Sequence, residues 1–471
     1  MNRSAPRNLI IRAGAVVLVL VLTAGCATYE PAPLDARDVA QRQKETRMDP
    51  DAVGAVLERI APDYRWDRAS WNELTLFAAA LAASPEAARA RSSLLAAQAS
   101  ARAASVAPGP SFALSAEYAL NAPEHSPWLL GVLGDLPLEA GGRRRARLES
   151  AEIALRQARL DYGQSIWRIR MSLRRALLAW RDSGDALEPS QTLLARTQAQ
   201  FDATLHRVEA GEVPRSDLER VRGDLAAAQD ALSSARALRD RSVIDLAAAI
   251  GVAPDAVRAL RIEAAAPVGA LPGAAPADAE QVALENRSEI SRAVTDYDLA
   301  ESGYRAAVAE QFPAVSIGAG YTWERGLKKL PAALTLALPS WDLNASAIRA
   351  AQAARDDAGA KLELAVATVL TEMRGAQSDY AAAQSAVALA EQEIVPAALR
   401  LADQADRELA VGWIDRADWA AAQAGLAKAR IDLLAARRRI RSTFLALEDA
   451  MQTPLAGPET MVGAGWAEPA G

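Results

Sequence analysis

Two stretches of alternating apolar and polar residues, set in an otherwise helical sequence pattern, most constrain the fold of this chain. In the first, Phe112, Leu114 and Tyr118 fall on one face of a strand, while Ser115 and Glu117 fall on the other. Alternation with a period of two residues is typical of a β-strand with two unlike faces. A turn-rich segment and a second apolar run follow, so the stretch predicts a β-hairpin.

The same pattern recurs about 200 residues later. Val315 and Tyr321 alternate with Ser316 and Thr322, and Tyr321 stands 203 residues after Tyr118. The sequence therefore predicts two hairpins, at residues 111–137 and 314–339, in two structural repeats of one chain.

Each predicted strand has about ten residues, the length that a tilted strand needs to cross a bilayer. The residues predicted to face lipid are Phe112, Leu114, Tyr118, Val315, Ile317 and Leu336. Those predicted to face a lumen are Ser115, Glu117, Ser316, Thr322 and Thr335. The aromatic residues expected in interfacial belts are Tyr118, Trp128, Tyr321 and Trp323. A half-buried hairpin of a soluble protein is the alternative interpretation.

Long coiled-coil helices are predicted after each hairpin. The first extends from Gly142 toward Glu209 with a stutter in its heptads, and Gly184 and Pro189 are expected to interrupt it. In the second copy the spacing of three and four residues continues without a break from Leu362 to Ile394. These apolar stripes indicate helix packing.

Each long helix is predicted to end at a glycine turn. Gly211 and Gly412 are 201 residues apart, and so are Asp217 and Asp418. Glycine is common just past a helix end because it adopts left-handed backbone angles. A capping box at Ser216–Glu219 is expected to start the returning helix.

The predicted organisation is therefore duplicated. A capping box at Ser70–Glu73 is expected to start the first repeat's opening helix at Trp71. The predicted segments are a signal peptide at 1–25, an N-terminal tether at 26–70 with one short helix near 51–60, a first repeat at 71–263, an inter-repeat linker at 264–277, a second repeat at 278–453 and a disordered tail at 454–471.

The N-terminus resembles a bacterial lipoprotein signal. A basic region precedes a short apolar run at 15–22, and the sequence Leu22–Cys26 reads LTAGC. The resemblance implies cleavage before Cys26, a lipid such as palmitate on its thiol, and export to the outer membrane because no aspartate follows Cys26. An ordinary signal peptide followed by a free thiol is the alternative.

Composition narrows the functional classes. The chain has 471 residues with 53 basic and 59 acidic side chains, and a net charge of −6, which gives no case for nucleic acid. The only histidines are His125 and His206, and Cys26 is the one cysteine. No set of residues fits a metal site, a cofactor or a catalytic centre, so the chain is predicted not to be an enzyme.

Residues 71–453 resemble the TolC-type outer-membrane efflux protein family. The resemblance is carried by the duplicated element order, by the G-x5-D pattern at each far turn, and by LPLEAGGRRRAR at Leu136–Arg147, which is most similar to the heavy-metal efflux branch. The second copy has Asn344 in place of the second glycine of this motif, and asparagine also tolerates left-handed backbone.

The resemblance implies a mainly α-helical fold with a membrane β-barrel. Three chains would each contribute four strands to one barrel and long helices to a periplasmic tunnel. The function implied is a passive outer-membrane exit duct for small molecules or metal ions, working with a periplasmic adaptor protein and an inner-membrane pump. The alternatives are a type I protein-secretion duct and a lipid-anchored coiled-coil scaffold without a pore.

The family's functional positions map onto the two far turns. Adaptor docking is expected at Ala210, Gly211, Glu212, Val411, Gly412 and Trp413. A ring of carboxylates at the channel gate is expected from Asp217, Asp418, Asp415 and Glu212. Trp413 or Trp419 is expected to add an apolar constriction. The simpler interpretation of these residues is helix capping, with Asp217 and Asp418 paired to Arg215 or Arg416.

Overall fold

The computed structural model describes residues 29–120, 127–139, 141–263, 278–324 and 327–455. The chain divides into two units, Met1–Glu45 and Thr46–Gly471. In the first unit, the helix α2 (Ala36–Glu45) buries no residue. The predicted signal peptide, Cys26 and the inter-repeat linker lie outside the described residues. Within the described ranges, no helix combines the length and the apolar character needed to cross a membrane.

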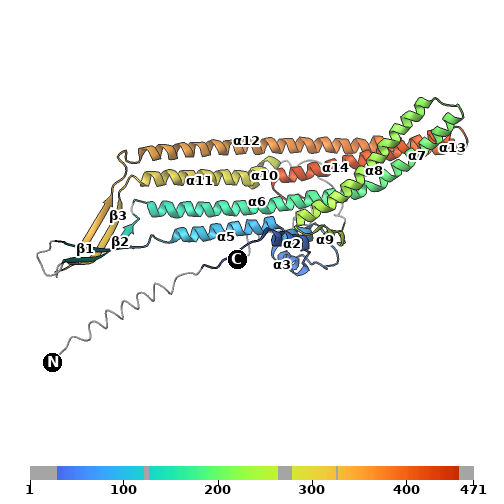
Figure 1. The fold of residues 1–471 in the computed structure, drawn as a ribbon. Coiled ribbons are helices and arrows are strands. Elements are labelled where there is room, and N and C mark those ends of the chain that lie inside the picture. The colour runs from blue at the N-terminus through green and yellow to red at the C-terminus, as the bar shows by residue number, and fades with distance from the viewer. Residues whose placement is uncertain (1–28, 121–126, 140, 264–277, 325–326, 456–471) are drawn as a thin grey trace. The chain divides into compact units, whose positions relative to one another are not determined.

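The second unit contains two copies of one element order (Figure 1). The first copy comprises α3 (Pro50–Ile60), α4 (Glu73–Ala83), α5 (Pro85–Ser105), β1 (Ser111–Tyr118), β2 (Trp128–Leu138), α6 (Arg143–Asp185), α7 (Leu187–Glu209), α8 (Arg215–Ile250) and α9 (Pro254–Arg258). The second comprises α10 (Ala279–Asn286), α11 (Ser288–Ala309), β3 (Ala314–Glu324), β4 (Leu327–Lys329), β5 (Ala332–Ala337), α12 (Ala345–Leu389), a π-helix (Ala390–Ile394), α13 (Val395–Ala410) and α14 (Arg416–Met451).

Within this unit, α5, α6, α11 and α12 lie side by side, with the sheet at one end of this helical layer (Figure 1). At the other end, α7 packs against α8 and α14, and α13 packs against α14. The mainly helical fold with one small sheet confirms the predicted fold class.

The two hairpins join into one antiparallel sheet with the order β1-β2-β3, and both β4 and β5 pair with β3. Their register is continuous: Leu114 pairs with Val132, which pairs with Tyr321. The returning strand of the second hairpin is thus split between β4 and β5. Among the described residues, β1 and β5 each pair on one side only.

The register also confirms the predicted division of the sheet into two faces. Paired residues share a face in an antiparallel sheet, so the residues predicted to face lipid all lie together, and those predicted for the lumen all lie opposite. On the apolar face, Leu114 is 85% exposed and Phe112 is 73% exposed. Tyr118 and Trp128 are paired there, with ring centroids 5.0 Å apart. We call this surface the apolar sheet face.

Left-handed residues connect the sheet to the long helices in both copies. Gly141 and Gly142 have φ angles of +68° and +87°, and Leu343 and Asn344 occupy the equivalent positions at +52° and +63°. The prediction that Asn344 preserves this turn is confirmed. Its amide donates a 2.8 Å hydrogen bond to the carbonyl of Ala307, which holds the strained turn in place.

The Asp342 carboxylate supports the same turn. It accepts hydrogen bonds from the backbone N–H groups of Asn344 and Ser346, at 3.2 and 3.1 Å. Hydrogen bonds from Ser340 and then Ser346 hold the pKa of Asp342 well below its usual value. The carboxylate therefore stays ionised as a fixed acceptor at this junction.

Two predicted helix starts are wrong. At α4, Asn72 and Thr75 form the capping box, with the Thr75 N–H donating to the Asn72 side chain at 3.0 Å. Trp71 cannot begin the helix because it is held in an extended bridge with Ile262. At α8, the helix already begins at Arg215, so Ser216 lies inside its first turn and does not cap it.

The long helices are interrupted in both copies. As predicted near Gly184, α6 ends at Asp185 and α7 begins at Leu187. In the second copy the continuous heptad prediction is wrong at its end, because a π-helix occupies Ala390–Ile394. Pro396 stands two residues after its end, and its ring would clash with the carbonyl four residues earlier in a regular α-helix.

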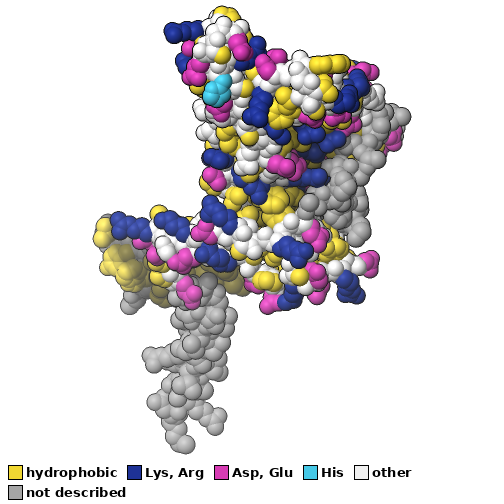
Figure 2. All heavy atoms as spheres, turned by 90° about the vertical axis from the view of Figure 1, so that its right-hand side faces the viewer, with side chains coloured by type: hydrophobic (Ala, Val, Ile, Leu, Met, Phe, Trp, Pro, Cys, Tyr) yellow, Lys and Arg dark blue, Asp and Glu magenta, His cyan; other side chains and the backbone are white. Residues whose placement is uncertain are grey.

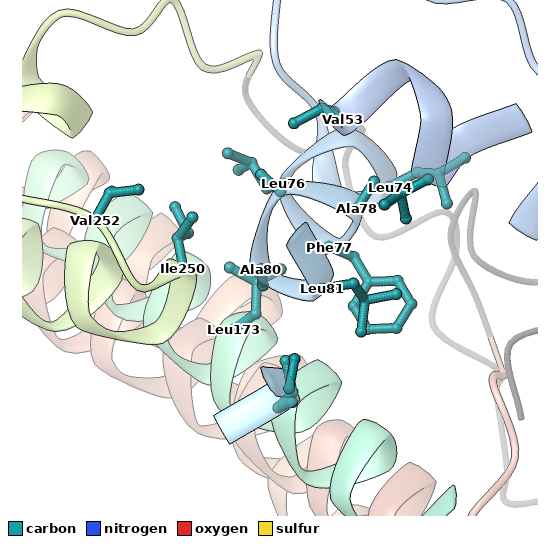
Figure 3. Close-up of a cluster of buried hydrophobic side chains, with 14 of the residues drawn as sticks. Val53, Leu74, Leu76, Phe77, Ala78, Ala80, Leu81, Leu173, Ile250 and Val252 are labelled. Carbon is teal, nitrogen blue, oxygen red and sulfur yellow. The ribbon is translucent and has the colours of Figure 1, made fainter. Parts of the chain in front are cut away.

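Two hydrophobic clusters hold the helices together. The first brings Leu76 and Phe77 of α4 against Leu173 of α6 and Ile250 of α8 (Figure 3). It also buries the apolar side of α3, so residues 46–60 belong to the core and not to a tether, contrary to the prediction. The second joins α10, α12 and α14, and includes Met373, Tyr380 and Phe444. Leu455, within the predicted tail, packs against it, whereas residues from 456 onward lie outside the described residues.

Candidate functional site

The first far turn is a glycine-terminated helix cap. The N–H of Glu212 donates to the carbonyl of Arg207 at 2.9 Å, and that of Gly211 donates to Val208 at 3.0 Å. This 6→1 and 5→2 pattern is the Schellman motif, which requires a left-handed residue. Gly211 supplies it with a φ angle of +76°.

The second far turn repeats this backbone geometry. The N–H of Trp413 donates to Glu408 at 2.9 Å, and that of Gly412 donates to Leu409 at 3.1 Å. The φ angle of Gly412 is +78°. The 201-residue spacing in the sequence therefore corresponds to two turns with the same hydrogen-bond pattern.

The turns differ in how the returning helix begins. Asp415 is the N-cap of α14, and its carboxylate accepts from the N–H groups of Ala417 and Asp418 at 2.7 and 2.9 Å. The equivalent residue before α8 is Pro214, which has no side-chain acceptor. Asp415 is therefore a helix cap, whereas Asp418 and Asp217 each lie in a first helical turn with their carboxylates free of this role.

Arg207 of α7 brings most of the predicted gate acids together. Its Nη1 lies 2.9 Å from Oδ2 of Asp415 and 3.9 Å from Oδ1 of Asp418. Its Nε lies 3.7 Å from Oε2 of Glu212. The predicted pairing with Arg215 or Arg416 is not found in the described part of the chain, because the packing of α7 against α14 places Arg207 closer. Asp217 has no ion pair among the described residues.

Sequence reasoning did not identify Arg207 as part of this site. The repeat itself contained a signal. Arg207 and Glu408 occupy equivalent positions, each one turn before a turn glycine, but they carry opposite charges. Figure 2, which faces the end of the molecule that carries these turns, shows Lys and Arg side chains interspersed with Asp and Glu.

The tips of both turns are open. Trp413 is 81% exposed, and a Cβ atom added to Gly211 or Gly412 would meet no atom of the described residues within 4 Å beyond its chain neighbours. Trp419 behaves differently, because its Nε1 donates to Asp406 at 2.6 Å and the Arg196 guanidinium lies 5.4 Å from its ring centre. Of the two predicted constriction residues, Trp419 is thus a packing residue and Trp413 remains available.

The described residues contain no group of three or more His, Cys, Asp or Glu that could hold a metal ion. The acids at the turns are instead arranged around an arginine and two helix N-termini. This arrangement can create a polar, partly neutralised aperture, but it contains no nucleophile paired with a base.

An exposed apolar sheet face joined to helices of 43 and 45 residues defines a membrane protein of mixed helix and sheet type. The chain belongs to the outer membrane efflux protein family, whose model matches residues 76–252 and 280–452. This membership confirms the predicted family and the predicted location in the outer membrane. It also confirms that the chain is a channel protein and not an enzyme. The comparison with curated proteins gives no match.

Solved structures share the fold at low sequence identity. The outer membrane protein VceC from Vibrio cholerae is 19% identical with a TM-score of 0.65, over 80% of this chain and 95% of VceC. The outer-membrane channel OprN is 20% identical with a TM-score of 0.67, over 90% of this chain and 97% of OprN. CusC, whose structure is described in relation to transmembrane channel formation, is 15% identical with a TM-score of 0.66, over 83% of this chain and 99% of CusC.

Proposed function

We propose that three copies of this chain form a passive exit duct through the outer membrane. The observation that carries the proposal is the apolar sheet face. Among the described residues, this sheet ends at β1 on one edge and at β4 and β5 on the other, and each of these strands pairs on one side only. An open sheet edge in lipid leaves backbone N–H and C=O groups unpaired, at several kcal/mol each. Pairing β5 of one copy with β1 of the next closes the sheet into a barrel and removes this cost.

The helical layer continues the duct into the periplasm. At 1.5 Å per residue, the 43 residues of α6 and the 45 residues of α12 extend about 65 Å. In this proposal a periplasmic adaptor and an inner-membrane pump complete the system, and the pump supplies the energy and selects small molecules or metal ions. The exposed tips at Ala210–Glu212 and Val411–Trp413 support their assignment as adaptor contacts.

The gate is proposed to use the carboxylates beside these tips. Threefold symmetry turns each residue into a ring of three, and a carboxylate ring at a narrow aperture favours cations. Arg207 lies 2.9 Å from Asp415, 3.7 Å from Glu212 and 3.9 Å from Asp418, so it offsets the charge of Asp415 most. Asp217, which has no ion pair among the described residues, and Asp418, whose contact with Arg207 is the longest of the three, are therefore the principal gate residues of the proposal, with Trp413 as an apolar neighbour.

Single-channel recording in a planar bilayer tests the duct and its gate together. The purified wild-type trimer should conduct with a preference for cations, and Asp418→Asn combined with Asp217→Asn should reduce that preference several-fold and weaken block by divalent cations. The matched control is Asp230→Asn with Asp432→Asn, which removes the same charge farther along α8 and α14. A wild-type trimer that does not conduct would contradict the duct. Unchanged cation selectivity in the Asp418→Asn and Asp217→Asn variant would show that these aspartates do not form the gate and only stabilise the helix ends.

Cys26 is proposed to carry a lipid that anchors the chain in addition to the barrel. The lipoprotein-type sequence before Cys26 supports this proposal. Cys26→Ala, expressed behind a cleavable signal peptide, should lose the mass of the lipid and yet remain a membrane-embedded trimer. Mass spectrometry and membrane fractionation measure the two outcomes, and release of the variant as a soluble monomer would contradict the barrel.

A further inference from the structure

The arginine run at the start of α6 divides into two pairs with different roles. Arg143 donates from Nη2 to the carbonyl of Phe312 at 2.8 Å. Arg147 forms a two-pronged contact with Glu139, with Nε–Oε1 and Nη2–Oε2 distances of 2.9 and 2.6 Å, and also donates to the carbonyl of Val106 at 3.2 Å. This first pair therefore fixes the end of the sheet to the helices.

Arg144 and Arg145 are not used in this way. Both are exposed, and neither forms an ion pair or a side-chain hydrogen bond with the described residues. Glu139 pairs with Arg147, whose hydrogen bond is the main cause of the lowered pKa of that carboxyl group, and the charge of Arg144 adds to the shift without forming an ion pair. At 3.6 residues per turn, Arg145 projects to the side of α6 opposite Arg143 and Arg147. Arg144 lies about a quarter-turn from Arg143 and Arg147.

The second pair lines a hollow on the surface of α6. The other residues that line it are Gly142, Leu148, Glu149 and Glu152. Glu149 is paired with Arg305 of α11 at 2.7 Å, and Glu152 lies about two turns beyond Arg145 along α6. The end of the hollow nearest the sheet thus presents two unpaired guanidinium groups beside an apolar side chain.

This hollow follows the end of β2 in the chain. The turn at Gly141 and Gly142 leads from β2, whose Leu136 and Leu138 are 47% and 40% exposed on the apolar sheet face, into α6. If the sheet is embedded as proposed above, these arginines lie at the headgroup level of the periplasmic leaflet. Long cationic side chains at such a boundary extend their charged ends toward the lipid headgroups.

We propose that Arg144 and Arg145 bind the phosphate of an anionic phospholipid of the periplasmic leaflet. The guanidinium group matches a phosphate through paired N–H donors, and Leu148 offers a contact for the lipid's apolar part. The second repeat has Ser346 and Ala347 at the equivalent positions, so each chain carries one such site. The inference rests on the proposed membrane function.

The test is a lipid titration of the purified full-length trimer in a neutral detergent, followed by native mass spectrometry. Phosphatidylglycerol should bind more tightly than phosphatidylcholine, with one tight site per chain. Because each arginine near an anionic surface contributes about a fivefold change in binding, Arg144→Gln with Arg145→Gln should weaken phosphatidylglycerol binding about 30-fold. The matched control is Arg438→Gln with Arg439→Gln, an adjacent exposed pair on α14.

Two results would overturn the lipid site. One is unchanged phosphatidylglycerol binding in the Arg144/Arg145 variant, and the other is displacement of the lipid by millimolar inorganic phosphate, which would indicate a general anion site. Channel conductance distinguishes the two proposals. A conducting trimer with unchanged lipid binding refutes the lipid site alone, whereas a wild-type chain that neither enters membranes nor conducts refutes the duct on which it rests.

Discussion

Replacing Glu448 with alanine is expected to destabilise the folded chain by about 3–5 kcal/mol, because the change removes the carboxylate that two buried guanidinium groups share. Glu448 is completely buried, and its Oε1 accepts from Arg170 at 2.7 Å and from the backbone N–H of Leu455 at 3.0 Å. Arg174 binds its other carboxylate oxygen.

The network around Glu448 joins the two repeats. Arg170 and Arg174 belong to α6, Glu448 belongs to α14, and Arg174 also pairs with Glu73 of α4. Burial raises the pKa of Glu73 in spite of the neighbouring Arg174. Without Glu448, two buried guanidinium groups would lose a shared carboxylate, and Arg174 would keep its pairing with Glu73.

Thermal melting of the purified trimer, combined with denaturant titration, measures the expected loss of stability. The matched control is Glu391→Ala, which removes an ion pair with Arg437 whose N–O distance is also 2.7 Å but whose side chains are 42% and 46% exposed. An exposed pair contributes about 0–1 kcal/mol, so this control should melt near the wild type. Similar melting temperatures for the two variants would show that the buried network does not hold the repeats together.

The strands and their faces could be predicted from sequence because the signal is local. A period of two residues assigns each side chain of β1 and β3 to a face, whatever the rest of the chain does. The same holds for the far turns, since Gly211 and Gly412 are required by the left-handed backbone at a helix end. Asn344 could likewise be predicted from its own conformational tolerance.

The contacts that sequence reasoning missed join residues far apart in the chain. The pairing of Arg207 with Asp415 depends on the packing of α7 against α14, which no local pattern reveals. The bridge between Trp71 and Ile262 shifted the start of α4 for the same reason. Glu448 and Arg170 look like ordinary helical surface charges until the helices that bury them are assembled.

Trp substitution at Gly412 is expected to abolish transport while leaving the trimer folded. A side chain in the left-handed region costs about 1–2 kcal/mol, which a helix of 36 residues with a buried inner side should tolerate. Apart from the chain neighbours of Gly412, no described residue lies within 4 Å of the added Cβ, so the indole would project into the space that the proposed adaptor occupies. The loss should therefore arise in docking and not in folding.

Gly412→Asn separates backbone strain from docking, because asparagine accepts left-handed angles, as Asn344 does in this chain, and adds far less volume. We expect this control to retain most of the efflux measured in cells that supply the cognate adaptor and pump, while Gly412→Trp loses nearly all of it. Both variants should match the wild type in trimer melting and in bilayer conductance, since neither measurement involves the adaptor. Gly211→Trp should add to the defect, because its turn has the same open geometry. Normal efflux by a chain with tryptophan at both positions would show that the adaptor does not bind these tips.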